Sequence, residues 1–240
     1  MHGLNALRRI VDEYEGCEKC ELLCGSRTQI VFGSGSATAD IVIVGEAPGA
    51  DEDLDGIPFT GRSGRLLLQL LEKVWDGDAE EVEEIRAIPK DDDDEYFRRV
   101  RDLVESRVFF TNVVMCHPEE NRTPSAKEIK NCKERLHKMI YAVDPKIVIA
   151  AGKTAASAVL GKKVPIVSKR GEIFDVSVTS PVTGEAIRYP MMALLHPSYL
   201  LRKGDMSLVS KQEGDTYLTM GDLRYAMTLL KEYNRISRRA

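Results

Sequence analysis

Three short apolar runs in this sequence are typical of strands buried on both faces of a sheet. Residues 39–45 form an almost continuous β-branched run that ends in a glycine, and residues 108–114 and 146–151 contain similar runs. Apolar runs that do not alternate with polar positions are typical of strands in parallel sheets. We therefore expect a central sheet in which these three segments pair in parallel.

Segments with helical spacing separate these runs. Leucines recur at helical spacing in residues 65–75, and further helices are predicted over residues 125–144, from Gly152 to near Gly161, and over residues 221–233. Strands that alternate with helices predict an α/β fold, a three-layer α/β/α sandwich around a mainly parallel central sheet.

The remaining segments predict the edges of the fold. Alternating residues in 171–183 indicate an edge strand, the turn at residues 181–184 indicates a hairpin, and residues 191–195 are predicted as the last strand. Residues 76–106 are polar and acidic, with a helical pattern over 96–104. We expect one domain over residues 1–240, with this acidic insertion as a solvated surface arm.

Composition excludes some classes of protein and leaves others open. The 240 residues are 43% hydrophobic and 30% charged, which is ordinary for a globular protein, and no run approaches the length of a membrane span. We expect a cytoplasmic monomer that binds no membrane. The net charge of −4 gives no indication of nucleic acid. The carboxylates are concentrated in residues 76–84 and 91–95, however, so a positive binding face elsewhere remains compatible with the sequence.

Chemistry is expected in the loops that follow the strands, because ligands bind at the carboxyl ends of parallel strands. The first loop contains Glu46, Glu52 and Asp53 among glycines that permit close approach of a ligand. Acidic groups there could orient water or stabilise a cationic sugar at an opened glycosidic bond. Phe59 should be exposed unless something stacks on it.

Two further strand ends carry polar groups. The amide of Asn112 could read the Watson–Crick edge of a pyrimidine, although a strand-end asparagine is also a common turn former. After the last strand, His196 could donate to an oxygen that becomes anionic, Leu200 and Leu201 could wedge into a base stack, and Arg202 could hold phosphate. We expect the three loops to converge at one edge of the sheet.

The cysteines suggest a metal centre. A Cys-x-x-Cys pair, Cys17 and Cys20, precedes two distant cysteines, Cys116 and Cys132. Four such thiolates could bind an iron–sulfur cluster or zinc, or the cysteines could simply be buried. Disulfides are not expected in a reducing compartment, and we interpret Cys24 as a spare or core thiol.

Several ordered motifs together resemble one known family, the family 4 iron–sulfur uracil-DNA glycosylases of bacteria and archaea. The similar segments run from Cys17 to about Arg202. They comprise the paired cysteines, Gly-Glu-Ala-Pro-Gly-x-x-Glu-Asp at 45–53, Gly-x-Pro-Phe-x-Gly-Arg at 56–62, Thr-Asn-x-x-x-Cys at 111–116, Asn-Arg-x-Pro at 121–124 and His-Pro-Ser-x-Leu-Leu-Arg at 196–202.

The resemblance implies a DNA glycosylase that flips a base out of DNA, hydrolyses its N-glycosidic bond and leaves an abasic site. It implies a structural [4Fe–4S] cluster on the four cysteines named above, and DNA that contains uracil or a modified pyrimidine as the partner. The site residues that we predict are catalytic Glu46, Asp53, Asn112 and His196; base-binding Ala47, Gly49, Glu52, Phe59 and Asn112; and DNA-binding Arg62, Ser198, Leu200, Leu201 and Arg202.

The sequence also departs from related glycosylases. Ala47 stands where some of them carry a water-activating aspartate, which leaves the water-positioning group open among Glu46, Glu52 and Asp53. The Lys-Arg-Arg-Ile-His type loop of the covalently trapping relatives is absent, so we expect no covalent histidine intermediate. Two alternatives remain: excision of a modified pyrimidine, and a catalytically silent iron–sulfur module that binds DNA.

Overall fold

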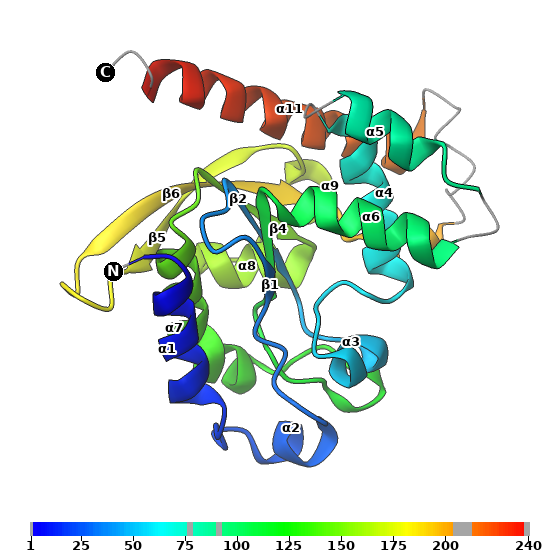
Figure 1. Cartoon of the computed structure of the whole chain (residues 1–240). Coiled ribbons are helices and arrows are strands. Elements are labelled where there is room, and N and C mark those ends of the chain that lie inside the picture. The colour runs from blue at the N-terminus through cyan, green and yellow to red at the C-terminus, as the bar shows by residue number, and fades with distance from the viewer. Residues whose placement is uncertain (1, 76–78, 90–92, 204–212, 238–240) are drawn as a thin grey trace.

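The computed structural model describes residues 2–75, 79–89, 93–203 and 213–237 (Figure 1). Strands and helices alternate along most of this chain. In order they are α1 (Leu4–Tyr14), α2 (Glu21–Ser26), β1 (Ser34–Gly35), β2 (Ile41–Gly45), α3 (Ala50–Asp55), α4 (Arg62–Val74), α5 (Ala79–Arg86), α6 (Asp93–Glu105), β3 (Val108–Asn112), the 3₁₀ turn η1 (Glu119–Asn121), α7 (Ala126–Val143), β4 (Ile147–Ala151), α8 (Lys153–Leu160), α9 (Ile166–Lys169), β5 (Ile173–Thr179), β6 (Ala186–Leu194), α10 (Pro197–Arg202) and α11 (Gly214–Ser237).

The described strands form one six-stranded sheet in the order β1-β3-β2-β4-β6-β5. The four central strands pair in parallel, and the short β1 and the long β5 pair antiparallel at the two edges. The prediction of an α/β fold around a mainly parallel sheet is therefore confirmed. Because the central strands are parallel, their carboxyl ends meet at one edge, where β2 and β3 pair Gly45 with Asn112.

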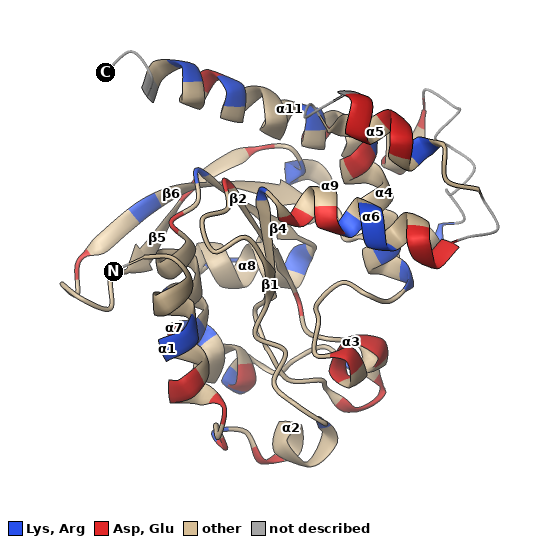
Figure 2. Cartoon of the chain, in the orientation of Figure 1, with Lys and Arg blue, Asp and Glu red and all other residues tan. Residues whose placement is uncertain are grey.

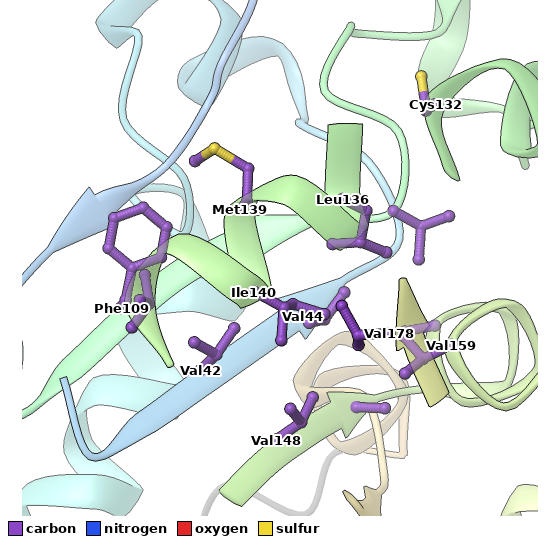
Figure 3. Packing of buried hydrophobic residues seen from close by; sticks show 14 of the residues in the cluster. Val42, Val44, Phe109, Cys132, Leu136, Met139, Ile140, Val148, Val159 and Val178 are labelled. Atoms are coloured by element: carbon purple, nitrogen blue, oxygen red, sulfur yellow. The ribbon is translucent and has the colours of Figure 1, made fainter. Parts of the chain in front are cut away.

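Both faces of the central strands are buried. Along β2, Val42 and Val44 face one core cluster, whereas Ile41 and Ile43 face the other. The first cluster lies against α1, α7 and α8 and the second against α4, α6 and α11 (Figure 1; Figure 3 shows part of the first). Successive side chains of a strand point to opposite faces of the sheet. Because both faces are buried here, neighbouring positions are all apolar, which explains the continuous apolar runs in the sequence.

Capping residues set the ends of α7 and α8, which the sequence predicted correctly. The Ser125 hydroxyl accepts a hydrogen bond from the N–H of Glu128 at 3.3 Å, and the Glu128 carboxylate accepts from the N–H of Ser125 at 2.7 Å, which makes a capping box at the start of α7. Asp144, at φ 54°, ends this helix. Gly152 and Gly161, both at positive φ, bound α8.

Other boundaries differ from the prediction. β6 begins at Ala186, five residues before the predicted start of the last strand at residue 191, and it forms the predicted hairpin with β5. Its first residues are polar or exposed because β5 and the start of β6 lie at the edge of the sheet. Helix α11 begins at Gly214 rather than residue 221, and α1, α2, α3, α5, α9 and α10 were not predicted.

The acidic segment 76–106 contributes to the core, contrary to the expectation of a solvated arm. Residues 76–78 and 90–92, and with them several of its acidic residues, lie outside the described residues. In the described part, Val100, Leu103 and Val104 of α6 are buried against α4 and the sheet. Acidic side chains gather on α5 and on the first turn of α6 (Figure 2).

Among the described helices, none combines the length and the apolar character that a membrane span requires.

We expect Leu103→Ala to lower the free energy of unfolding by about 2–5 kcal/mol, because it deletes a buried side chain from the packed face of α6. Its neighbour Asp102 is exposed and makes a surface ion pair with Arg98, so Asp102→Ala should cost less than about 1 kcal/mol. Urea unfolding of both variants measures the difference. Equal effects would mean that α6 is not part of the core.

Candidate active site

A pocket of about 550 Å³ opens at the edge where the parallel strands end. The loops after β2, β3, β4 and β6 all contribute to it, so the predicted loops do converge. Nine of the predicted site residues line it, namely Glu46, Ala47, Gly49, Glu52, Phe59, Asn112, His196, Ser198 and Arg202.

The innermost contacts join the ends of β2 and β3. A Cβ atom built on Gly45 would overlap the Asn112 side-chain oxygen and would lie 2.8 Å from Cζ of Phe59. The Asn112 amide, buried at 3% exposure, and the Phe59 ring therefore meet over a strand-end glycine. Any residue other than glycine at position 45 would carry a Cβ atom that prevents this contact.

Phe59 is buried rather than exposed. Its ring lies 5.3 Å from the ring of Phe110, at a tilt of 48°, and only 6% of the residue is accessible. The backbone of Phe59 has φ 59°, in the left-handed region that costs a residue with a side chain about 1–2 kcal/mol. The condition in the prediction, that Phe59 is exposed unless something stacks on it, is met within the protein, because the Phe110 ring packs against Phe59.

His196 is held as a neutral ring with a defined tautomer. Burial, and to a smaller extent the charge of Arg202, lower the pKa of His196 to about 4. The backbone N–H of Ser198 donates to Nδ1 at 3.1 Å, and the Ser198 hydroxyl lies 2.8 Å from the same atom. Since Nδ1 accepts, the proton of the neutral ring is on Nε2. His196 also packs against Gly152, where a Cβ would lie 3.0 Å from the His196 Cβ.

The three carboxylates of the first loop differ in their availability. Glu52 accepts from the N–H of Gly49 at 2.9 Å and from the N–H of Gly61 at 3.1 Å, so both its oxygens hold loop backbone. Asp53 is buried, does not line the pocket and accepts from the N–H of Thr28 at 2.7 Å. Glu46 lines the pocket, and within the described residues its carboxylate has no hydrogen-bond partner.

The predicted DNA-binding residues fall into two groups. Ser198 and Arg202 line the pocket, and Arg202 donates to the Ser198 hydroxyl at 3.2 Å. Leu200 is buried in the core at 1% exposure, so it has no free side chain to wedge into DNA in this conformation. Arg62 is exposed at the start of α4, and Leu201 is half-buried; neither lines the pocket.

Sequence reasoning missed several residues that line the pocket. Lys153 and Thr154 follow the end of β4, and Tyr199 lies beside His196. The rule that ligands bind at strand ends could have identified the first two, since Gly152 was already recognised as the start of a helix. Arg122 also lines the pocket, where Glu128 holds its guanidinium at 2.7 and 2.9 Å. This ion pair helps to lower the pKa of Glu128 to about 2.

The four predicted cysteine ligands all belong to the first core cluster or its margin. Cys116 and Cys132 are buried in the first core cluster, and Cys17 and Cys20 pack against that cluster. Burial raises the pKa values of Cys20 and Cys116, and the neighbouring Cys132 raises both further. All five cysteines are free thiols.

Two arginines face these sulfur atoms. Arg27 donates to the Cys116 sulfur at 3.1 Å, and Arg135 donates to the Cys132 sulfur at 3.2 Å. Arg135 is 1% exposed, and its Nε and Nη1 have no hydrogen-bond partner among the described residues. A buried cation with unpaired N–H groups is costly unless negative charge lies nearby.

The described residues offer no group of three or more His, Cys, Asp or Glu side chains close enough to surround a single metal ion. A zinc site needs its ligands within about 2.0–2.3 Å of one ion. An iron–sulfur cluster instead takes four cysteines on different irons and so accepts wider spacing. The thiols are therefore spaced more suitably for a cluster than for one zinc ion, and the two guanidinium groups beside them can offset the negative charge of four thiolates.

Comparison with known proteins gives a consistent result. A family model described as the uracil DNA glycosylase superfamily matches residues 32–216. Among curated proteins, a type-4 uracil-DNA glycosylase of Thermotoga maritima is 34% identical over 204 residues, which cover 84% of this chain and 87% of that protein. Type-4 uracil-DNA glycosylases of Saccharolobus solfataricus and Archaeoglobus fulgidus are 31% and 29% identical, over 81% and 82% of this chain and 80% and 84% of theirs.

We expect the stability of the protein to depend on His196 between pH 6.5 and 4. Its pKa is about 4 in the folded chain against an ordinary value of 6.5, so the unfolded chain takes up the proton first as the pH falls. This contribution to stability is therefore lost on acidification, on the order of 2 kcal/mol by pH 5. Urea unfolding of wild type and His196→Gln at pH 7 and pH 5 measures it. If both proteins lose the same free energy between these pH values, the assignment of a buried neutral imidazole is wrong.

Proposed function

This chain belongs to the uracil DNA glycosylase superfamily and, within it, to the type-4 group, and on this premise we propose that it excises uracil from DNA. The reaction flips the base out of the helix and hydrolyses its N-glycosidic bond, which leaves an abasic site. The observation that carries the proposal is one pocket lined by a buried strand-end amide, a supported aromatic ring and a neutral imidazole whose proton is on Nε2.

Asn112 and Phe59 recognise the base. A pyrimidine edge with one N–H and one carbonyl is complementary to the acceptor and donor of a single amide. The ring of Phe59, fixed on Phe110, supplies a flat apolar surface on which the base stacks. Because the Asn112 oxygen is packed against Gly45, its amide has little freedom to turn towards a different hydrogen-bonding pattern.

His196 stabilises the departing base. Cleavage leaves an oxocarbenium-like sugar and a uracil anion, so a donor placed at a base oxygen contributes more in the transition state than in the ground state. A neutral imidazole is a suitable donor, because Nε2–H polarises the oxygen without transferring its proton. The Ser198 N–H keeps Nδ1 as the acceptor and so maintains this tautomer.

Glu46 positions the water. Glu52 and Asp53 are both engaged in holding backbone, whereas Glu46 reaches the pocket with its carboxylate unengaged by the described residues. A carboxylate here can orient a water molecule and stabilise the cationic sugar. We therefore assign the water-positioning role to Glu46, and to Glu52 and Asp53 the role of fixing the loop.

The DNA backbone is held by the basic side chains at the rim of the pocket. Arg202, Lys153 and Arg122 line it on different elements and can each contact a phosphate. Arg62 and Leu201 remain candidates for contacts outside the pocket. The four cysteines near Arg27 and Arg135, namely Cys17, Cys20, Cys116 and Cys132, would hold a structural [4Fe–4S] cluster as thiolates. The cytoplasm remains our prediction for the location, because its reducing conditions keep thiols available as ligands. A monomer remains our prediction for the oligomeric state.

We expect the protein to release free uracil from uracil-containing oligonucleotides and His196→Ala to reduce the single-turnover rate by about 10²–10³-fold, as loss of one transition-state donor typically does. Asn112→Ala should cause a comparable loss. His137→Ala is a matched control. This histidine lies on α7, does not line the pocket, and accepts a hydrogen bond from the N–H of Thr179. Alkaline cleavage at the abasic sites measures the reaction.

The alternatives give different results in the same assay. Release of only a modified pyrimidine would retain the mechanism and reject uracil as the target. Salt-dependent DNA binding without release of any base, by protein that carries its cluster, would indicate the catalytically silent module.

We expect anaerobically purified protein to be brown and to contain about four iron and four sulfide per chain. Cys132→Ala should lose the cluster and, because Arg135 then has no anionic partner, should unfold at a lower temperature than wild type. Cys24→Ala is the matched control, since Cys24 donates to the carbonyl of Cys17 and is not one of the four ligands. Zinc in place of iron, or equal loss of iron in both variants, would contradict the assignment.

A further inference from the structure

The conformation of Phe59 requires something that holds it. Its φ of 59° is in the left-handed region, and it is one of four described residues other than glycine with a positive φ. Apart from glycine, mainly asparagine and aspartate tolerate this region, whereas a phenylalanine there must be fixed by its surroundings. The ring contact with Phe110 fixes the side chain but not the backbone.

One side chain binds the backbone at this position. Arg101 donates from Nη2 to the carbonyl of Phe59 at 2.6 Å and from Nη1 to the carbonyl of Pro58 at 3.3 Å. Its guanidinium also lies 6.0 Å from the centre of the Phe110 ring. Arg101 therefore binds the backbone of Phe59 and lies over the aromatic ring that supports the Phe59 side chain.

Arg101 is itself held in place. Glu105, one turn later on α6, accepts from its Nη1 at 2.7 Å, and the same carboxylate oxygen accepts from the Ser34 hydroxyl at 2.7 Å. The ion pair is largely sheltered, with 16% of the Arg101 side chain and 21% of the Glu105 side chain exposed. A sheltered guanidinium with a carboxylate partner and two carbonyl acceptors has few other orientations available.

The start of α4 also packs closely against the Phe59 backbone. A Cβ atom on Gly64, in the first turn of α4, would overlap the carbonyl group of Phe59. The Phe59 carbonyl is thus approached closely both by the start of α4 and by Arg101 of α6. Displacement of the Phe59 carbonyl towards Gly64 is blocked, so its position depends on the Arg101 hydrogen bonds.

We propose that Arg101 is a positioning residue for base excision: it holds the Phe59 backbone in the left-handed conformation and so sets the ring against the flipped base. The proposal rests on the proposed function, and it gives the acidic segment 76–106 a part in the site, since α6 carries both Arg101 and Glu105. Arg101 does not line the pocket and acts only through Phe59.

The test is a double-mutant cycle on single-turnover excision from uracil-containing DNA. We expect Arg101→Ala to lower the rate roughly tenfold or more and Arg101→Lys to restore part of it, because an ammonium can reach one carbonyl but cannot match the guanidinium fork. In a Phe59→Ala background, Arg101→Ala should have little further effect, since the ring it positions is gone. Arg98→Ala, an exposed arginine on the same helix that pairs with Glu95 and Asp102, should keep the wild-type rate.

The outcomes separate this inference from the proposed function. If wild type releases uracil but folded Arg101→Ala does so at the same rate, or if the two losses multiply fully in the double variant, Arg101 is not a positioning residue. If wild type releases no uracil, the proposed function itself fails. If Arg101→Ala does not fold, the excision rates of Arg101→Lys and Arg101→Gln are compared instead, each with Phe59 present and with Phe59→Ala. Melting temperatures then show whether each variant is folded.

Discussion

The parallel pairing of β2 with β3 and β4 is the constraint on which the rest of this structure depends. It is possible only because these strands are apolar on both faces and are covered by helices on both sides. Parallel strands place their carboxyl ends together, and the loops after β2, β3, β4 and β6 therefore meet around one pocket. Residues separated by more than a hundred positions in the sequence, such as Glu46 and His196, are brought together by the sheet rather than by any direct attraction.

Acidic residues near the pocket mostly hold the backbone. Glu52 joins the loop before α3 to the loop before α4, and Asp53 joins α3 to the segment at Thr28. In this glycine-rich region, each carboxylate accepts hydrogen bonds from backbone N–H groups that would otherwise need a backbone carbonyl as partner. These carboxylates have a structural role, and the negative net charge of the chain is compatible with a site that faces a polyanion because Arg122, Lys153 and Arg202 line the pocket.

The sequence predicted what local patterns determine. The apolar runs identified the central strands, and Ser125, Asp144, Gly152 and Gly161 marked helix ends correctly because caps depend on nearby residues. The site residues were predicted as a set, but their individual placement was less predictable. Whether Glu46 or Asp53 faces the pocket depends on the direction of a loop, and the burial of Phe59 depends on Phe110. The contact between Arg101 and Phe59 joins segments far apart in the chain, and no local pattern indicates it.

The register between β2 and β3 has a consequence for folding accuracy. Thr111 and Asn112 are neighbours on β3 that point to opposite sides: the Thr111 hydroxyl donates to the carbonyl of Phe32 at 2.7 Å, whereas the Asn112 amide lies over Gly45. A slip of one residue would exchange these directions along the whole strand. Because both faces of β3 are apolar, such a misaligned chain would still bury hydrophobic side chains and remain compact. The small polar contacts at the strand end, rather than the core, are therefore what distinguishes the correctly aligned protein from a compact but inactive one.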